Sequence, residues 1–438
     1  MESFFKITER GSTWSRETIG GLTTFLAMAY IVAVNPAILA EAGVPFQAAL
    51  TATCLSAAIL TITMGLAANR PLALAPGMGL NAVVAYTLCL GMGVDWRVAM
   101  GVVMVEGLVI FILVLCGLRR AIMDAIPVDL RLAIGIGIGV FVAFIGLKGG
   151  GIVTDDASTL LALGDLSSPA CIVSLVSILV AIVLYALHVP GALLVSIVVG
   201  TLVGIPLGVS VVPTEWGFGL DFSAFAAPLQ TDPATNMPAI LRAATQPGLL
   251  IAAFSLLMSD FFDTMGGVVA VGRQGGFADD RGNVDDLQPI LAVDSLGAAI
   301  GGFLGASSVT VYVESAVGAA AGARTGFSNL VIGILFVVCA FFSPIVGMVS
   351  GSATCGALTV VGCLMMASIG EIDWSRFEHA FPAFAIIAGI PFTYSITNGI
   401  GLGFVSYVVI MVVIGRAREI KPLMWVASVA FLLMFIFA

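Results

Sequence analysis

Charged side chains are scarce in this chain of 438 residues. Asp, Glu, Lys and Arg make up only 10% of it and hydrophobic residues 60%, and the mean hydropathy is +1.13. This composition excludes a soluble globular protein. Histidine occurs twice, at His188 and His379, and the seven cysteines show neither CxxC nor zinc-finger spacing. The cysteines are therefore interpreted as small core residues, and no metal or cofactor is expected.

Long uncharged runs dominate what is present. Five stretches contain no Asp, Glu, Lys or Arg: Thr18–Ala40, Phe46–Asn69, Leu166–Thr214, Thr325–Gly370 and Ala380–Gly415. Each has at least the ~20 apolar residues that a helix needs to cross a bilayer, and several have enough for two crossings. The first run is long and continues into further runs, which is typical of a retained helix and not of a cleaved signal peptide. The sequence predicts an all-α polytopic membrane protein.

The few basic residues indicate how the chain is oriented. Alternating the predicted spans leaves 14 of the 17 Lys and Arg on the side of the amino terminus and only Arg97, Lys148 and Arg242 on the other. Basic residues favour the cytoplasmic side, so the amino terminus is predicted to be cytoplasmic and the protein to lie in the cell (inner or plasma) membrane. The net charge of −9 gives no indication of a nucleic-acid partner.

The spans divide into two halves of seven, followed by an apolar segment at 422–438. Because seven is odd, the second half enters from the opposite side, which predicts an inverted repeat. The expected spans are 17–40, 46–69, 71–93, 97–118, 128–147, 168–187 and 189–211, then 247–272, 287–304, 307–323, 326–349, 352–369, 380–395 and 397–415.

The third and tenth spans do not read as plain helices. The third begins Pro71-Leu-Ala-Leu-Ala-Pro76-Gly-Met78-Gly79-Leu-Asn81, and the tenth runs from Gly305 through Thr310 and Tyr312 to Glu314. Both predict a short extended stretch that leads into a half-helix starting near the middle of the membrane. Paired interrupted segments in inverted halves indicate a polar binding site. The other interpretation of the Gly-Met-Gly run is close helix packing through small residues.

Four carboxylates lie within three successive spans, which contain no Lys or Arg near them. They are Asp260 and Asp263 in span eight, Asp294 in span nine and Glu314 in span ten. An ionisable side chain at this depth is costly and marks an ion or substrate path. Burial and neighbouring acids both disfavour the charged form, so at least one of the four is expected to carry a proton. A proton-coupled carrier needs such groups.

Simpler interpretations of the polar residues also stay open. Any of the four acids could serve only as a neutral hydrogen-bond donor between helices, with Asp263 and Asp294 the stronger candidates for that role. Glu106 in span four has no companion motif and is interpreted as packing or a helix tie. The run Asp279–Asp286 could suggest a cation loop, but a solvated connector explains it better.

Five stretches, taken together, resemble one family. They are Thr23–Phe25 with Met28-Ala29-Tyr30 and Val34-Asn35-Pro36, then Ala75–Ala82, Asp260-Phe-Phe-Asp263-Thr264, Thr310–Ser315 and Pro391–Ile400. In order and spacing the chain resembles the nucleobase:cation symporter superfamily, in particular the azaguanine-resistance-type purine permeases. The likeness runs from Arg10-Gly11-Ser12 to the last helix.

The resemblance implies a division of the chain and roles for its residues. It implies a cytoplasmic amino terminus (1–16), a core domain (17–118 and 247–349), a gate domain (119–246 and 350–415) and a C-terminal apolar segment (416–438). The substrate-binding residues would be Glu314, Asp260, Asn81, Gly79, Met78, Thr310 and Tyr312, and proton coupling would use Asp260, Asp263, Asp294 and Glu314. A homodimer formed through the gate domain would also fit the family.

The function expected from this resemblance is import of purine nucleobases (guanine, hypoxanthine or adenine) by proton symport, with no enzymatic activity. The remaining alternatives are a carrier of anions, xanthine or uracil with the same architecture, and a passive channel. An anion carrier would be expected to place a cation near the site and to lack four acids there. An intramembrane protease would need a Gly-x-Gly-Asp pair or a His-Glu-x-x-His helix, and the sequence has neither.

Overall fold

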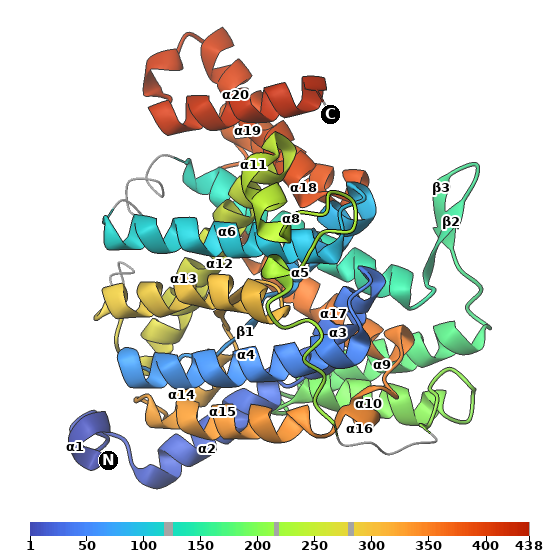
Figure 1. Cartoon of the computed structure of the whole chain (residues 1–438), viewed down its shortest axis with the longest axis vertical. Coiled ribbons are helices and arrows are strands. Elements are labelled where there is room, and N and C mark those ends of the chain that lie inside the picture. The colour runs from blue at the N-terminus through green and yellow to red at the C-terminus, as the bar shows by residue number, and fades with distance from the viewer. Residues whose placement is uncertain (118–125, 214–218, 279–283, 438) are drawn as a thin grey trace.

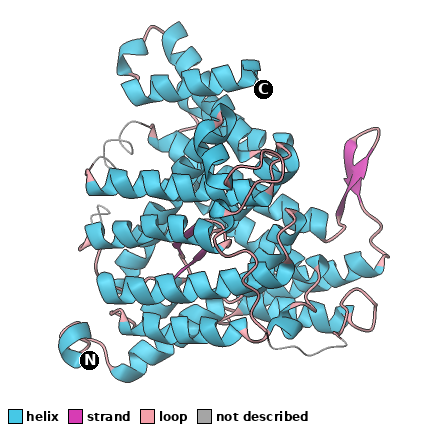
Figure 2. Ribbon diagram, viewed as in Figure 1, coloured by secondary structure: helices cyan, strands magenta, loops and turns pink. Residues whose placement is uncertain are grey.

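The computed structural model describes residues 1–117, 126–213, 219–278 and 284–437. Several residues used in the sequence analysis lie outside them: Arg119, Arg120 and Arg281 of the charge count, and Asp279 and Asp280 of the acidic run. The described chain is mostly helical, with two short antiparallel sheets of two strands each (Figure 2).

The first half of the chain contains seven segments that correspond to the seven expected spans. A short α1 (Glu2–Phe5) precedes them. The first two of the seven segments are α2 (Trp14–Met28) continued by α3 (Ile31–Glu41), and α4 (Phe46–Ala67). The third is the broken segment, which consists of β1 (Leu74–Pro76), α5 (Met78–Ala82) and the π-helix η1 (Val83–Gly91). The last four are α6 (Trp96–Leu115), α8 (Val128–Gly149), α9 (Pro169–Ala186) and α10 (Ala192–Gly204). Between α8 and α9, β2 (Val153–Asp156) and β3 (Leu160–Leu163) form a hairpin that projects at the right of Figure 1.

The second half repeats this order. After η2 (Ala227–Leu229) and α11 (Ala239–Thr245) come α12 (Pro247–Gly275), α13 (Leu287–Leu304), the broken segment β4 (Val309–Val311) with α14 (Ser315–Ala320), α15 (Phe327–Ala340), α17 (Gly351–Met365) continued by η3 (Met366–Glu371), α18 (Phe377–Thr393) and α19 (Ile396–Val413). The short α16 (Ser343–Val346) follows α15, and η4 (Ala417–Glu419) and α20 (Pro422–Phe437) end the chain. The broken segment is third in each half, which confirms the 7+7 arrangement.

Two predicted spans end earlier than expected, in both cases ahead of a proline. The seventh span was expected to reach residue 211, but α10 ends at Gly204, two residues before Pro206. The eleventh was expected to reach residue 349, but α15 ends at Ala340, ahead of Pro344. Proline has no backbone N–H, so Pro206 and Pro344 cannot continue the hydrogen-bond ladder of the helix before them.

The split between the last two spans is confirmed. Tyr394 closes α18 in a left-handed conformation with φ 53°, and the side chain of Ser395 accepts a hydrogen bond from the Asn398 N–H to cap α19. Serine is a favoured N-cap because its side-chain oxygen satisfies a donor in the first turn of the helix.

The helices pack into two sets. The first contains α2 to α6 with α12 to α15, and the second contains α8 to α10 with α17 to α19. In Figure 1 the long helices α4, α6, α13 and α15 run side by side, and β1 lies at the centre of the molecule. Helix α20 packs on α19 and also contacts α12. The division of the chain into a moving core and a static gate stays a prediction.

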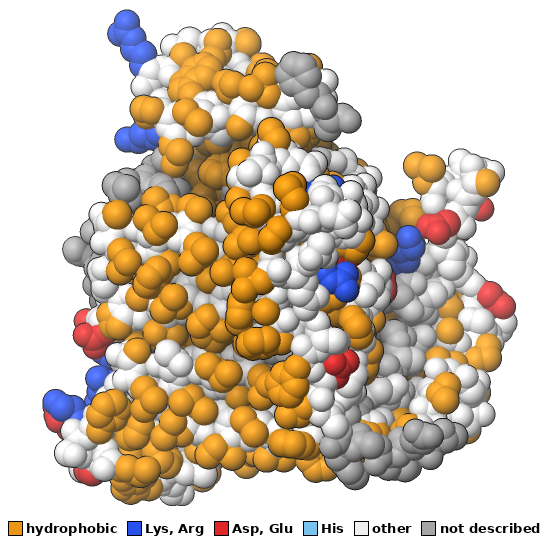
Figure 3. Space-filling model, in the orientation of Figure 1, with side chains coloured by type: hydrophobic (Ala, Val, Ile, Leu, Met, Phe, Trp, Pro, Cys, Tyr) orange, Lys and Arg blue, Asp and Glu red, His pale blue; other side chains and the backbone are white. Residues whose placement is uncertain are grey.

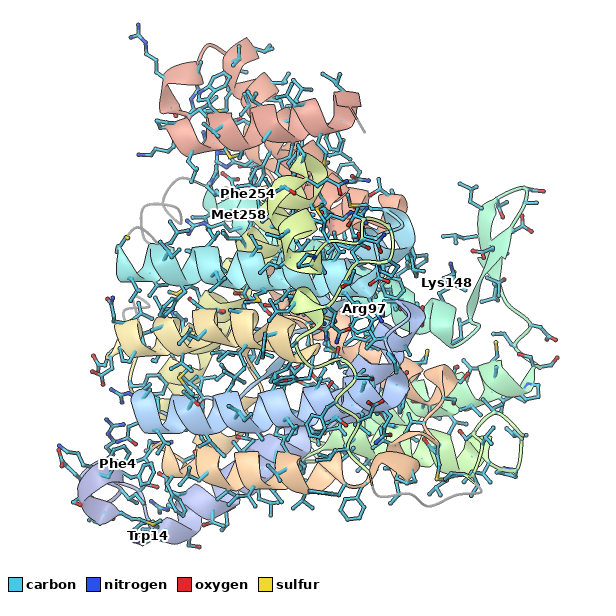
Figure 4. All side chains as sticks on the ribbon, viewed as in Figure 1. Phe4, Trp14, Arg97, Lys148, Phe254 and Met258 are labelled. Atoms are coloured by element: carbon cyan, nitrogen blue, oxygen red, sulfur yellow. The ribbon has the colours of Figure 1, made fainter. Side chains whose placement is uncertain are left out.

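The surface fits a membrane setting. Nine helices among the described residues are long and apolar enough to cross a bilayer by length and composition. Figure 3 shows a broad uncharged band over α4, α6, α13 and α15, with Lys, Arg, Asp and Glu mainly towards the margins. In Figure 4, Arg97 and Lys148 lie at the end of the helices away from Phe4 and Trp14, as the charge count requires.

Candidate functional site at the crossing of two broken helices

The centre of the site is a pair of short strands from opposite halves of the chain. Strands β1 and β4 are antiparallel, with Ala75 opposite Thr310 and Pro76 opposite Val309. The pairing extends beyond the strands, since the Gly77 N–H donates to the Ser308 carbonyl and the Tyr312 N–H to the Ala73 carbonyl. Proline at 71 and 76 disfavours helix here, and β-branched residues favour the extended partner.

Side chains of neighbouring helices satisfy the strand edges that have no strand partner. The Thr61 hydroxyl of α4 lies 2.9 Å from both the N and the O of Leu74, and the Ser315 hydroxyl accepts from the Ala73 N–H at 2.9 Å. The Asn329 amide donates to the Leu72 carbonyl at 2.8 Å. Extended backbone at membrane depth is stable only when its polar groups are paired in this way.

Glu314 lies where β4 passes into α14. Its side chain is half-buried, and its Oε1 accepts a hydrogen bond of 2.6 Å from the Tyr30 hydroxyl. The Tyr312 hydroxyl donates to the Pro76 carbonyl at 2.6 Å, and the two tyrosine rings lie 6.5 Å apart. These contacts fix the crossing of the strands and orient the carboxylate, which still has acceptor positions for a ligand because a carboxylate accepts about four hydrogen bonds.

The acids of α12 differ in their exposure. Asp260 is buried, whereas Asp263 is exposed. Asp263 interacts electrostatically with Glu314 and with Asp294, and α12 packs against α5, β4 and α14. The structure therefore brings α12, the eighth span, to both broken segments.

Asp294 belongs to a buried hydrogen-bond network. Its Oδ2 accepts from the Thr264 hydroxyl at 2.8 Å, and its Oδ1 lies 3.3 Å from both the Thr310 hydroxyl and the Val311 N–H. The hydroxyl oxygens of Thr264 and Thr310 are 2.8 Å apart. Asp294 thus ties α12, α13 and β4 together behind the strands. A role in proton coupling stays a prediction.

Asn81 and Gly79 face different surroundings on α5. Asn81 is fully buried, and neither atom of its amide has a hydrogen-bond partner among the described residues. Buried amides are normally paired, so this side chain has both a donor and an acceptor to offer a ligand or a water molecule. Gly79 packs against α8, where an added Cβ would lie 2.4 Å from Ile138 Cγ2. Close packing, the alternative for the Gly-Met-Gly run, therefore applies at Gly79. Met78 is buried next to it.

Two residues of the site were missed as site residues by the sequence analysis. Tyr30 and Thr264 both lie within the motif stretches, yet nothing in the sequence showed that they reach Glu314 and Asp294. Their position in apolar spans was the one signal available, because a buried Tyr or Thr hydroxyl needs a hydrogen-bond partner.

No group of three or more His, Cys, Asp or Glu in the described part of the chain could hold a metal ion. A groove of about 350 Å³ between α19 and α20 is apolar and involves none of these acids.

Comparisons with known proteins agree with this architecture. The family model described as "Permease family" matches residues 15–402. The guanine/hypoxanthine permease PbuG of Bacillus subtilis is 41% identical over 446 residues, covering 100% of both chains. The adenine permease AdeP of Escherichia coli is 37% identical over 441 residues, covering 100% of this chain and 96% of its own.

Among solved structures, the transmembrane domain of the cyanobacterial bicarbonate transporter BicA superposes with a TM-score of 0.65. It covers 88% of this chain and 97% of its own at 17% identity, which shows a shared fold only. These matches are to membrane transporters and not to enzymes. The chain belongs to the permease family, as a multi-pass membrane protein with the 7+7 inverted-repeat fold.

Proposed function

We propose that this permease imports purine nucleobases together with protons, by alternating access around the crossing of β1 and β4. The observation that carries the proposal is the position of Glu314. Its carboxylate is partly accessible, oriented by Tyr30, and set beside an exposed acid on α12. The names of PbuG and AdeP, which specify guanine, hypoxanthine and adenine, supply the substrate class.

The chemistry of the site suits a purine. A purine presents ring N–H groups and, in guanine and adenine, an amino group, which a carboxylate can accept in pairs. The free amide of Asn81 can donate to a ring nitrogen or carbonyl and accept from an N–H. In the proposal Glu314, Asp260 and Asn81 contact the base, with Met78, Gly79, Thr310 and Tyr312 shaping the site around it.

Proton coupling is supported by the number of acids. Asp260, Asp263, Asp294 and Glu314 lie on three adjacent segments, α12, α13 and β4–α14, which carry no Lys or Arg near them. Acids within a membrane are characteristic of proton relays in transporters. The proposal also places the amino terminus in the cytoplasm and self-association on the set α8 to α10 with α17 to α19.

The test is uptake of labelled hypoxanthine into proteoliposomes that contain the purified protein. An alkaline interior should drive accumulation, a protonophore should abolish it, and adenine and guanine should compete better than xanthine, uracil or bicarbonate. Vesicles containing Glu314→Ala protein serve as the control. Uptake that follows a sodium gradient and ignores pH, or that never saturates, would contradict the proposal.

A further inference from the structure

Glu106 is a buried acid that takes no part in the site described above. Glu106 lies in the middle of α6 with 1% of its surface exposed. Neither of its carboxylate oxygens has a hydrogen-bond partner among the described residues, and no Lys or Arg of that part of the chain pairs with it. A charged carboxylate in these surroundings would be strongly disfavoured.

Helix packing sets Glu106 beside the helix of Asp294. Helix α6 lies so close to α13 that a Cβ added to Gly107 would be 2.2 Å from the Ala299 N, and one added to Gly302 would be 2.8 Å from the Met100 carbonyl. Asp294 lies on the same helix, five residues before Ala299, and the two carboxyl groups interact electrostatically.

The other elements packed against α6 bring no comparable charge to Glu106. They are α11, α12, η1 and η2. Arg242 of α11 pairs with Asp232, α12 carries Asp260, Asp263 and Arg273, η1 carries Tyr86 and Cys89, and η2 carries no titratable group. Of all these described groups, only Asp294 acts electrostatically on Glu106.

The two acids lie in opposite environments. Asp294 accepts from the Thr264 hydroxyl and the Val311 N–H, with the Thr310 hydroxyl also in reach. Glu106 has no such donor among the described residues. Where two carboxyl groups interact, protons are taken up and released by the pair and not by either residue alone.

We infer that Glu106 is a proton-binding residue of the coupling machinery, acting through Asp294 from behind the strand crossing. A proton leaving Glu106 deposits a second negative charge beside Asp294. Asp294 then takes up a proton or loses part of its hydrogen bonding to Thr264 and Val311. Either change reaches β4 and α12, the two elements that carry Thr310 and the site acids. This inference rests on the proposed proton symport and adds a residue to it.

The experiment compares Glu106→Gln with Glu106→Asp in proteoliposomes. The amide keeps the shape and the neutrality of the acid but cannot release a proton, whereas aspartate is shorter but still titrates. In one-proton symport a gradient of about one pH unit sustains roughly tenfold accumulation, because one unit is worth about 1.36 kcal/mol. We expect Glu106→Asp to retain most of that accumulation and Glu106→Gln to lose it while still exchanging internal for external base.

A structural role for Glu106 predicts the reverse order, with the isosteric Gln active and the cavity-forming Asp impaired. That result, or loss of both variants from the membrane, would overturn the inference. Glu371→Gln, an exposed position at the end of η3, is the matched control. If the wild type itself shows no accumulation driven by pH, the proposed function fails. If the wild type accumulates substrate and Glu106→Gln does so equally, only the role of Glu106 fails.

Discussion

At the scale of single residues, the contact between Tyr30 and Glu314 joins the first span to the tenth, 284 positions apart. It leaves one side of the carboxylate for a ligand and fixes the other. Binding of a base by that carboxylate depends on both the charge and the orientation of the carboxylate. Different substitutions can change one of these without the other.

We predict that Glu314→Ala weakens purine binding by about 1.5–3 kcal/mol, roughly ten- to a hundred-fold, because a charge-assisted contact is lost while the ligand's donors stay buried. Glu314→Gln should bind poorly as well, since its amide group meets a purine edge that offers donors. Tyr30→Phe should have a smaller effect because it changes only orientation. Base binding by purified protein, with membrane abundance measured in parallel, is the test. Near-normal affinity in both Glu314 variants would remove this residue from the site.

Substitutions at Asp260 and Asn81 distinguish the coupling of transport to protons from the binding of the base. Asp260→Asn keeps the shape of the side chain but cannot release a proton, so accumulation should fall while exchange of base persists. Asn81→Ala removes hydrogen bonds without a change of charge, so affinity should fall by about 0.5–1.5 kcal/mol while coupling is retained. The measurement is the ratio of accumulation to exchange in the same vesicles. An Asp260→Asn protein that concentrates base as the wild type does would contradict the assignment.

At the scale of elements, the two broken segments could be predicted from the sequence. The side chains that hydrogen-bond to their strand edges could not. Pro71 and Pro76 indicated an extended stretch, and Val309-Thr-Val indicated its partner, because both signals are local in sequence. Thr61, Ser315 and Asn329 pair the strand edges from elements distant in sequence, and single-sequence patterns do not reveal such long-range contacts. Likewise Glu314 and Asp260 were expected from their placement in apolar spans, whereas Tyr30 and Thr264 became evident only once the helices were packed.

We predict that Thr61→Val destabilises the protein by about 1–3 kcal/mol, because it leaves the buried N–H of Leu74 without a partner. Thr63→Val on the same helix is the control, since the Thr63 hydroxyl donates only to the Ile59 carbonyl of its own helix. Thermal unfolding in detergent should show a lower midpoint for Thr61→Val alone. Equal midpoints for the two variants would mean that the strand crossing does not depend on Thr61.

At the scale of the whole molecule, the two helix sets meet beside the site. Helix α5 contacts α8, and α12 contacts α8 and α19. If one set moves against the other during transport, contacts across this boundary exist in some conformations and not in others. A substitution that alters such a contact shifts the balance of conformations by the difference in its free energy between them.

Gly79 offers the sharpest test of such a shift. An added Cβ would lie 2.4 Å from Ile138 Cγ2, so Gly79→Ala should disfavour this conformation by about 1–3 kcal/mol, the usual cost of overpacking. The rate of purine exchange should fall, and Ile138→Ala in the same chain should restore it by making room for the methyl group. Gly135→Ala on α8 is the control, because nothing lies within 4 Å of a Cβ there. If the double variant is no faster than Gly79→Ala alone, the contact with Ile138 does not limit transport, and Gly79 acts through the bound base instead.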